Sequence, residues 1–323
     1  MSEKDGGWRD VVSRYNFPDN KSSIWQLVNS VVPFIALWVL MYYSLEWSYW
    51  ITLLLMIPAS GFMVRIFIIF HDCGHKSFFK SAKWNERVGF FTGLFTLTPY
   101  HKWHRSHNKH HATVGNLDKR GVGDVLTMTV KEYETASKGR RLFYRLYRHP
   151  IIMLGIGGPY IFFLQNRWYP KGVQAREKRS VWITNLVVAT IVTGMSLLIG
   201  FKAFFLIEFP LILIASIIGT WLFYVQHQFE DVHWFRKDEW EFETIALSGS
   251  SFYKLPRILQ WFSGNIGFHH VHHLGSKIPN YKLDKCHREN EIFTQVKPVS
   301  LYASRKSLKL RLWDEEAGKI VGF

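Results

Sequence analysis

Cysteine is almost absent from this chain of 323 residues, which contains only Cys73 and Cys286. Two cysteines cannot form a disulfide framework, a four-cysteine zinc site or an iron–sulfur cluster. Acidic residues are also scarce, because 25 Asp and Glu stand against 40 Lys and Arg, a formal net charge of +15. Internal repeats are missing too, and a content of 48% hydrophobic residues excludes a disordered chain. The mean hydropathy is close to zero because long apolar runs offset very basic stretches, and this division indicates an integral membrane protein.

Long apolar runs alternate with basic stretches along the chain. A helix that crosses a bilayer needs about 20 apolar residues, and four runs meet this requirement, at about 24–47, 51–70, 181–199 and 203–226. Two shorter runs, 88–99 and 150–165, are expected at the membrane interface. Arg65 lies inside the second run, and we expect its side chain to extend toward the cytoplasmic interface. We predict an all-α integral membrane protein with four transmembrane helices.

The distribution of charge predicts the orientation of these helices. Only short loops join the first run to the second and the third to the fourth, so residues 71–180 and 227–323 share one side with the N-terminus. Of the 40 Lys and Arg, 20 lie between His71 and Ser180 and 14 after Gln226. Because basic residues mark the cytoplasmic side, we expect a helical cap and both termini in the cytoplasm, with residues 1–323 forming one domain. Such a face suits anionic lipids and acidic proteins, and the spread of its charges argues against nucleic acid.

Histidine is concentrated in three short clusters. Ten of the 15 histidines lie in HDCGH, HRSHNKHH and HHVHH, which begin at His71, His104 and His269. Spacings of three and four residues place imidazoles on one face of a helix, and imidazole binds iron, copper, zinc and nickel. The histidines that share a face in this way are His71, His75, His107, His110, His111, His269, His272 and His273. One tetrahedral zinc takes at most four ligands, so eight nitrogens predict a site for two metals.

A single pair of histidines four residues apart is more often a surface pair than a metal site. Three such clusters beside membrane spans, on the side that the loops assign to the cap, favour metal binding instead. A histidine-rich metal transporter remains an alternative, although a transporter should bury polar residues along several spans, and only Arg65 and Glu208 qualify here.

The clusters resemble the three histidine boxes of membrane fatty acid desaturases. HDCGH, HNKHH within WHRSHNKHHAT, and HHVHH within GFHHVHH follow that family's order and spacing. The stretches GNLDKRGVGDV and KIPNYKL, which follow the second and third boxes, are similar to those of acyl-lipid and acyl-CoA desaturases, particularly bacterial ones. The resemblance covers nearly the whole chain, but related di-iron hydroxylases and ketolases that act on alkanes or carotenoids share the boxes and remain an alternative.

The resemblance implies a cytoplasmic cap that holds a non-haem di-iron centre with about nine histidine ligands and no other catalytic residue. His227, at the end of the fourth run, fits the ninth position beside the eight above, and His233 is a weaker candidate. His104 and His270 fall outside the pattern. Asp72, Glu230 and Asp231 are candidates to orient ligand imidazoles, or else simple helix-end charges.

The implied reaction is the O2-dependent introduction of a cis double bond into an acyl chain attached to a lipid, CoA or a carrier protein, in the bacterial cell membrane. Electrons must come from an external donor such as ferredoxin, flavodoxin or cytochrome b5, because the sequence has no haem-binding HPGG segment and no glycine-rich nucleotide fingerprint. Since histidine binds metal only when neutral, we expect activity to be lost on acidification.

Overall fold

The computed structural model describes residues 7–121 and 123–323, and most of them are helical. Four long helices dominate the fold, namely α2 (Asn20–Ser44), α3 (Tyr49–His75), α9 (Ala175–Ile199) and α10 (Phe201–His227). Each of them is long and apolar enough to cross a membrane. The predicted all-α fold with four spans is therefore confirmed.

The bounds of these helices differ from the expected runs for local reasons. α2 begins earlier than expected because the Asp19 carboxylate accepts a hydrogen bond from the backbone N–H of Ser22, 2.9 Å away. α3 continues beyond residue 70 through the whole first histidine cluster. It ends where Lys76 adopts a left-handed conformation with φ of 57°. The first cluster is thus held on the last turn of a long, regular helix.

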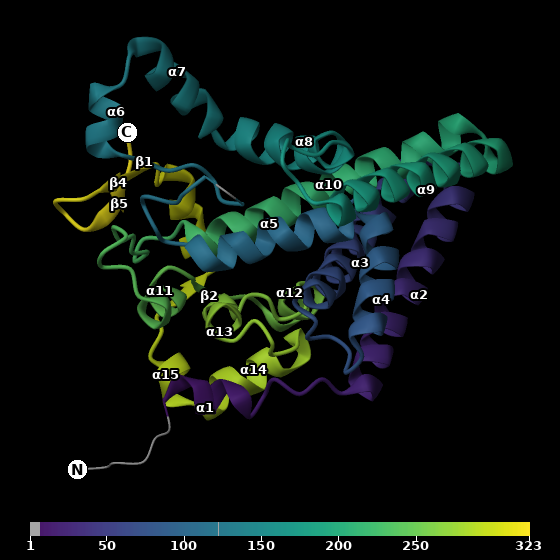
Figure 1. The fold of residues 1–323 in the computed structure, drawn as a ribbon. Helices are drawn as coiled ribbons and strands as arrows, with labels where there is room; N and C mark the ends of the chain where they lie inside the picture. Colours follow the sequence, from purple (N-terminus) through teal and green to yellow (C-terminus); the bar gives the residue numbers. More distant parts are fainter. Residues whose placement is uncertain (1–6, 122) are drawn as a thin grey trace.

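The long helices form two antiparallel hairpins, α2–α3 and α9–α10, whose tight turns lie at the same end of the molecule (Figure 1). The main apolar core lies where α2, α3 and α10 meet, around Met56, Met63, Ile207 and Leu211. Most of the remaining elements gather at the other end, where α10 and α3 finish, while α4 lies beside α3 and α8 beside α10. The chain therefore has a membrane-spanning part and a cap.

The shorter helices make up most of the cap. They are α1 (Trp8–Ser13), α4 (Ala82–Phe95), α5 (Tyr100–Thr113), α6 (Val130–Thr135), α7 (Lys138–Tyr147), α8 (Gly158–Phe163), α11 (Phe242–Ser248), α12 (Arg257–Phe262), α13 (His269–Leu274), α14 (Asn280–Glu289) and α15 (Glu291–Thr294). A π-helical segment, η1 (Ile151–Gly157), precedes α8, and two 3₁₀ segments occur, η2 (Gln165–Arg167) and η3 (Ala303–Lys309). The two short apolar runs form the second half of α4 and the η1–α8 segment, and α8 packs on α10.

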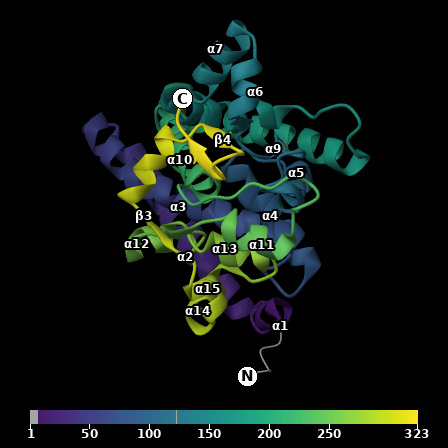
Figure 2. The ribbon, with the colours of Figure 1, turned by 90° about the vertical axis from the view of Figure 1, so that its left-hand side faces the viewer.

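Five short strands, which the sequence did not predict, complete the cap. They are β1 (Met128–Thr129), β2 (Phe252–Lys254), β3 (Pro298–Ser300), β4 (Leu312–Asp314) and β5 (Lys319–Val321). β4 pairs in parallel with β1 and antiparallel with β5, while β2 and β3 pair in parallel. Figure 2, viewed from the side of the cap away from the helical hairpins, shows β3 and β4 toward the viewer. They fasten the C-terminal segment to the rest of the cap.

Arg65 does not reach the aqueous interface as expected. Its side chain is 7% exposed, and the guanidinium lies 4.0 Å from the ring centroid of Trp261 on α12. Its Nε donates to the Ser30 hydroxyl at 3.1 Å, and Nη1 donates to the carbonyl of Trp261. Because α12 covers the side of α3, these partners replace water around the charge.

Candidate metal centre

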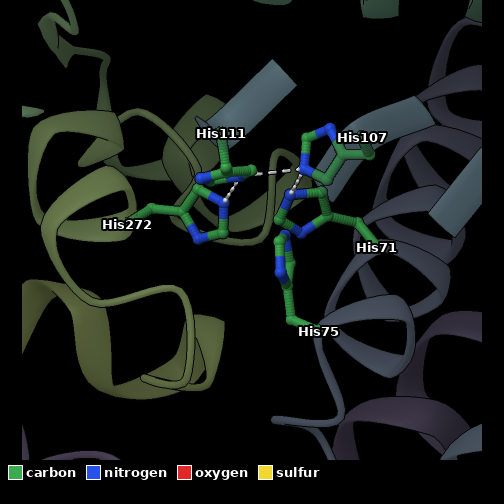
Figure 3. Close-up of side chains that lie close together, drawn as sticks. All are labelled: His71, His75, His107, His111 and His272. Atoms are coloured by element: carbon green, nitrogen blue, oxygen red, sulfur yellow. Dashed lines mark hydrogen bonds between the residues drawn. The ribbon is translucent and has the colours of Figure 1, made fainter. Parts of the chain in front are cut away.

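Five of the predicted histidines converge on one point between three helices. α3 contributes His71 and His75, α5 contributes His107 and His111, and α13 contributes His272. One nitrogen of each ring lies within 4.8 Å of the corresponding nitrogen of every other ring. The rings point toward a common centre (Figure 3). This is the first histidine group.

The other four predicted histidines form a second group beside the first. These are His110 on α5, His227 at the last residue of α10, and His269 and His273 on α13. All four are buried. The two groups are neighbours, because the rings of His111 and His273 stack with centroids 4.2 Å apart. The structure thus brings together all nine histidines predicted from the sequence, including His227, and excludes His233.

The spacing of the imidazole nitrogens fits metal ligation. In the first group, Nε2 of His107 lies 3.0 Å from Nε2 of His71 and 3.1 Å from that of His111. In the second group, Nε2 of His227 lies 3.1 Å from Nε2 of His110 and 3.0 Å from that of His269. Metal–nitrogen bonds of about 2.1 Å at right angles separate two ligand nitrogens by about 3.0 Å, whereas a tetrahedral angle separates them by about 3.4 Å. The nearest nitrogens in each group are thus close enough to bind one metal ion together.

Two nitrogens in the first group lack a hydrogen-bond partner among the described residues, Nε2 of His75 and Nδ1 of His272. Nε2 of His75 is buried and makes no hydrogen bond with residues 7–121 and 123–323. A buried polar atom without a partner costs about 1–3 kcal/mol. A metal ion at the centre of the group would satisfy Nε2 of His75. The donor set and its orientation therefore fit a metal centre.

The outer nitrogens of several rings are fixed by hydrogen-bond acceptors. Nδ1 of His71 donates to the Asp72 carboxylate at 3.1 Å, and Nδ1 of His110 donates to Asp124. Nδ1 of His227 donates to the carbonyl of Gly249 at 3.1 Å. When the proton sits on Nδ1, the lone pair of Nε2 points into the group. These acceptors select the tautomer that can bind metal.

Asp72 is itself held in place by α14. Its second oxygen accepts hydrogen bonds from the backbone N–H of Asn280 at 2.7 Å and from the side-chain amide at 2.8 Å. The expected role of Asp72 as an orienting residue is therefore supported by geometry. Glu230 and Asp231, the other two candidates, are exposed and pair with Lys306 and Lys297 at 2.8 and 2.7 Å.

Burial keeps the cap histidines of the two groups neutral. Desolvation, reinforced by neighbouring imidazoles, holds the pKa of His107, His111, His269, His272 and His273 well below the usual value. A neutral imidazole is the form that binds metal. The folded protein therefore presents these side chains ready for ligation at neutral pH.

The remaining candidate histidines lie outside both groups. His233 is exposed, and its Nδ1 contacts the carbonyl of Asp231 at 3.0 Å. Nε2 of His104 lies 3.0 Å from the side-chain amide nitrogen of Asn108. His270 is buried and pairs with His287 at 3.0 Å, away from the inward side of α13.

Sequence analysis missed three parts of the centre. Asp124 lies in the quoted stretch GNLDKRGVGDV, but nothing in that stretch marks it as a partner of His110. Gly249 contributes a backbone carbonyl, which has no sequence signal. The ring of Trp103 stacks on His107 with centroids 4.4 Å apart, and its spacing of four residues before His107 was the available clue.

A small apolar cavity of about 30 Å³ lies between α3, α8 and α10. It is lined by Met63, Val64, Phe67, Phe162, Ile212 and Ala215, among others. Phe67 stands one helical turn before His71 on α3. The lining of the cavity therefore comes within one helical turn of His71.

Comparison with known proteins identifies the family. The family model described as fatty acid desaturase matches residues 45–298. A protein of Bacillus subtilis (strain 168) named fatty acid desaturase is 48% identical over 312 residues, which cover 97% of this chain and 89% of that protein. The chain belongs to the fatty acid desaturase family. The resemblance noted in the sequence is thus confirmed, and this desaturase is an oxidoreductase that acts on fatty acyl chains.

More distant relatives carry more specific names. A Synechocystis protein named sn-1 acyl-lipid omega-3 desaturase (ferredoxin) is 29% identical over 239 residues, covering 68% of this desaturase and 62% of the relative. An Anabaena variabilis protein named sn-1 oleoyl-lipid 12-desaturase is 27% identical over 279 residues, which cover 83% of this desaturase and 76% of the relative. The family and the two histidine groups, each of which could hold a metal ion, support a metal site, and the four apolar helices fit a membrane protein.

Proposed function

We propose that this desaturase introduces a cis double bond into the acyl chain of a membrane lipid, using O2 and two irons held by the nine histidines of both groups. The observation that carries the proposal is the convergence of five and four imidazoles in adjacent groups. The whole chain, residues 1–323, would act as one domain.

Iron is supported by the number and spacing of the donors. The nearest ring nitrogens lie 3.0–3.1 Å apart, which suits pairs of nitrogens that bind one metal ion. Structural zinc prefers tetrahedral sites with four ligands, whereas the first group offers five nitrogens. A bound di-iron pair would supply the O2 chemistry needed to remove hydrogens from unactivated methylenes, which no side chain can do.

The residues of the chain supply the binding, the orientation and the exclusion of water. Asp72, Asp124 and the Gly249 carbonyl hold ligand imidazoles in the metal-binding tautomer. The cavity beside Phe67 and Ile212 is apolar, but its volume of about 30 Å³ has room for about one methylene, so an acyl chain would need these side chains to move apart. A chain seated there would come close to the first histidine group.

The substrate class follows from the relatives. The Synechocystis protein is named as an acyl-lipid desaturase and the Anabaena protein as an oleoyl-lipid desaturase, so we take the substrate of this desaturase to be a lipid-linked acyl chain. The basic cap would face the cytoplasm with both termini, and the protein would reside in a bacterial cell membrane. This orientation follows the excess of Lys and Arg in residues 71–180 and 227–323.

An acidic electron donor of the ferredoxin or flavodoxin type would dock beside the first group, where His107 and His111 are partly exposed. Lys277 donates to the carbonyl of His75 at 2.6 Å, and exposed Lys76 follows His75. Charge reversal at Lys76 and Lys277 should raise the KM for the donor. An unchanged KM would contradict this docking site.

The proposed function is tested by fatty-acid methyl-ester analysis of a bacterial host that expresses the full chain with a ferredoxin and its reductase. The control is the triple variant His107→Ala, His110→Ala, His111→Ala. A new unsaturated acid, present only with intact histidines, is expected, and its fragmentation locates the double bond. A hydroxylated or keto product, or an unchanged profile with a well-expressed metal-loaded protein, would overturn the proposal.

A further inference from the structure

A groove of about 500 Å³ opens on the cap beside the membrane-spanning part. Its walls are α4, the start of α5 and the start of α9, which are neighbours in the fold. Residues before Ser180 in α9 are highly charged and those after it are apolar. Since the apolar part of α9 is a candidate membrane span, the groove lies at the level of the membrane interface.

The groove carries positive charge that the protein leaves uncompensated. Lys83 and Arg87 of α4 and Arg179 of α9 line it, and all three are exposed. Within residues 7–121 and 123–323 they form no salt bridge; Arg87 lies over the ring of Trp84, with 5.4 Å between its guanidinium carbon and the ring centroid. Three free cations around one groove attract an anion.

The single carboxylate in the groove is already engaged. One oxygen of Glu86 lies 2.9 Å from Nη2 of Arg176, and the other lies 3.0 Å from Nε2 of His101. Both partners line the same groove. Glu86 is thus neutralised on one wall, and it does not offset the charge of Lys83, Arg87 and Arg179.

The other end of the groove is apolar. Phe90 and Ile183 line it on the side of the membrane-spanning part. Two tryptophans flank it with their rings exposed, Trp84 at 54% and Trp182 at 64%. Tryptophan at this level is typical of a membrane interface. A ligand that fits both ends must join an anionic group to an apolar one.

We propose that this groove binds an anionic phospholipid of the adjoining leaflet. Its phosphate would lie among Lys83, Arg87 and Arg179, and its glycerol and first methylenes would contact Phe90 and Ile183. The site is separate from the metal centre, because the ring of Tyr100 forms the wall between them and its hydroxyl donates to the carbonyl of Cys73 at 2.6 Å. The bound lipid is therefore distinct from an acyl substrate in the cavity beside Phe67.

A lipid in this groove would tie three elements together near the second histidine cluster. α5 is already joined to α9 there, since the backbone N–H of His101 donates to the Ser180 hydroxyl at 3.1 Å. α4 packs on α5 through Gly89, where an added Cβ would lie 2.2 Å from the ring of Tyr100. Occupancy should stabilise this junction and raise the unfolding temperature.

The test uses the full metal-loaded chain in detergent with three probes, namely dihexanoyl phosphatidylglycerol, dihexanoyl phosphatidylcholine and inorganic phosphate. Native mass spectrometry measures the affinities, and thermal unfolding measures the stabilisation. Phosphatidylglycerol should bind at least tenfold more tightly than either other probe and should raise the Tm. The variant Lys83→Gln, Arg87→Gln, Arg179→Gln should weaken that binding about tenfold or more.

A matched variant controls for the loss of three positive charges. Lys138→Gln, Arg140→Gln, Lys171→Gln changes exposed residues that do not line the groove, and it should bind like the unaltered protein. Phe90→Ala, tested separately, should weaken the lipid but leave phosphate binding unchanged, and it does not depend on the folding of the triple variant. Equal lipid binding by all variants would overturn the proposal. Phosphate binding as tight as that of the lipid would make this a site for free phosphate and would also overturn it.

Discussion

The ligand histidines depend on the residues behind them. A neutral imidazole has one protonated nitrogen, and the acceptor at Nδ1 decides whether Nε2 is free to bind metal. The Asp124 carboxylate accepts the hydrogen bond from Nδ1 of His110, and the Asp72 carboxylate accepts the one from Nδ1 of His71. Each group thus contains at least one carboxylate–histidine pair, an arrangement that also raises the basicity of the ligand.

Replacing Asp124 should damage the second group selectively. In Asp124→Asn the amide can present a donor to His110, which favours the wrong tautomer, and loss of such a partner typically costs about 10–100-fold in metal affinity or activity. Metal content after dialysis against a graded series of chelator measures the effect. The control is Asp118→Asn, which alters an exposed pair with Arg236 in the same loop. Equal metal retention by both variants would show that Asp124 does not orient His110.

Individual site residues could be predicted from the sequence where they recur at the spacing of a helical turn. Eight histidines follow from helical periodicity alone, whereas His227 needed the resemblance to a family because it stands by itself at the end of a span. Asp124 was not predicted, because a carboxylate in a loop 14 residues after His110 has no periodic relation to it. The exposure of Arg65 was predicted wrongly, because no local sequence pattern indicates that α12 covers its side chain.

Among the elements, α3 and α5 must keep a fixed separation for the first group to form. α4 sets part of this separation, because it packs closely on both helices. At Gly89 of α4, an added Cβ would lie 2.2 Å from the ring of Tyr100 and 3.0 Å from Cβ of Cys73. Tyr100 begins α5 and Cys73 lies between the two histidines of α3. The absence of a side chain at Gly89 therefore lets α4 pack closely enough to hold α3 and α5 at the separation that the first group needs.

Gly89→Ala should consequently destabilise the protein. Overpacking of this kind costs about 1–3 kcal/mol, so we expect a lower Tm in detergent and a partial loss of bound metal. Gly194→Ala is the matched control, since an added Cβ there has no neighbour within 4 Å on the surface of α9. A variant Gly89→Ala as stable as Gly194→Ala would mean that α4 can move without disturbing the centre.

Long helices could be predicted from the sequence, whereas short strands could not. Long apolar runs gave the four spans to within a few residues, because bilayer thickness fixes their length. The errors at their ends come from capping by Asp19 and from the continuation of α3 through its histidines. The short strands escaped prediction because pairs such as β1 and β4 are far apart in the chain.

The molecule as a whole should lose metal and stability in acid. The pKa values of His107, His111, His269, His272 and His273 are depressed in the folded state, while unfolded histidines titrate near about 6.5. Protons therefore bind the unfolded chain first, so the stabilising contribution is complete above about pH 6.5 and declines below it. Metal content and Tm measured across this range should fall together. Full activity retained well below pH 5 would contradict the account.

The metal centre exists only at the scale of the whole fold. Its proposed ligands come from α3, α5, α10 and α13, which lie within residues 49–274 of the chain. Loop parity predicted that the three clusters share one side of the membrane. The division into five and four could not be predicted, because His110 and His111 are adjacent in sequence yet belong to different groups.

The most direct test of the central claim is the number of irons per chain, measured by plasma mass spectrometry on purified full-length protein. The account predicts about two irons in the unaltered protein. It predicts about one in each single-group variant, His75→Ala for the first group and His273→Ala for the second. A single metal per chain in the unaltered protein, or zinc in place of iron, would contradict it.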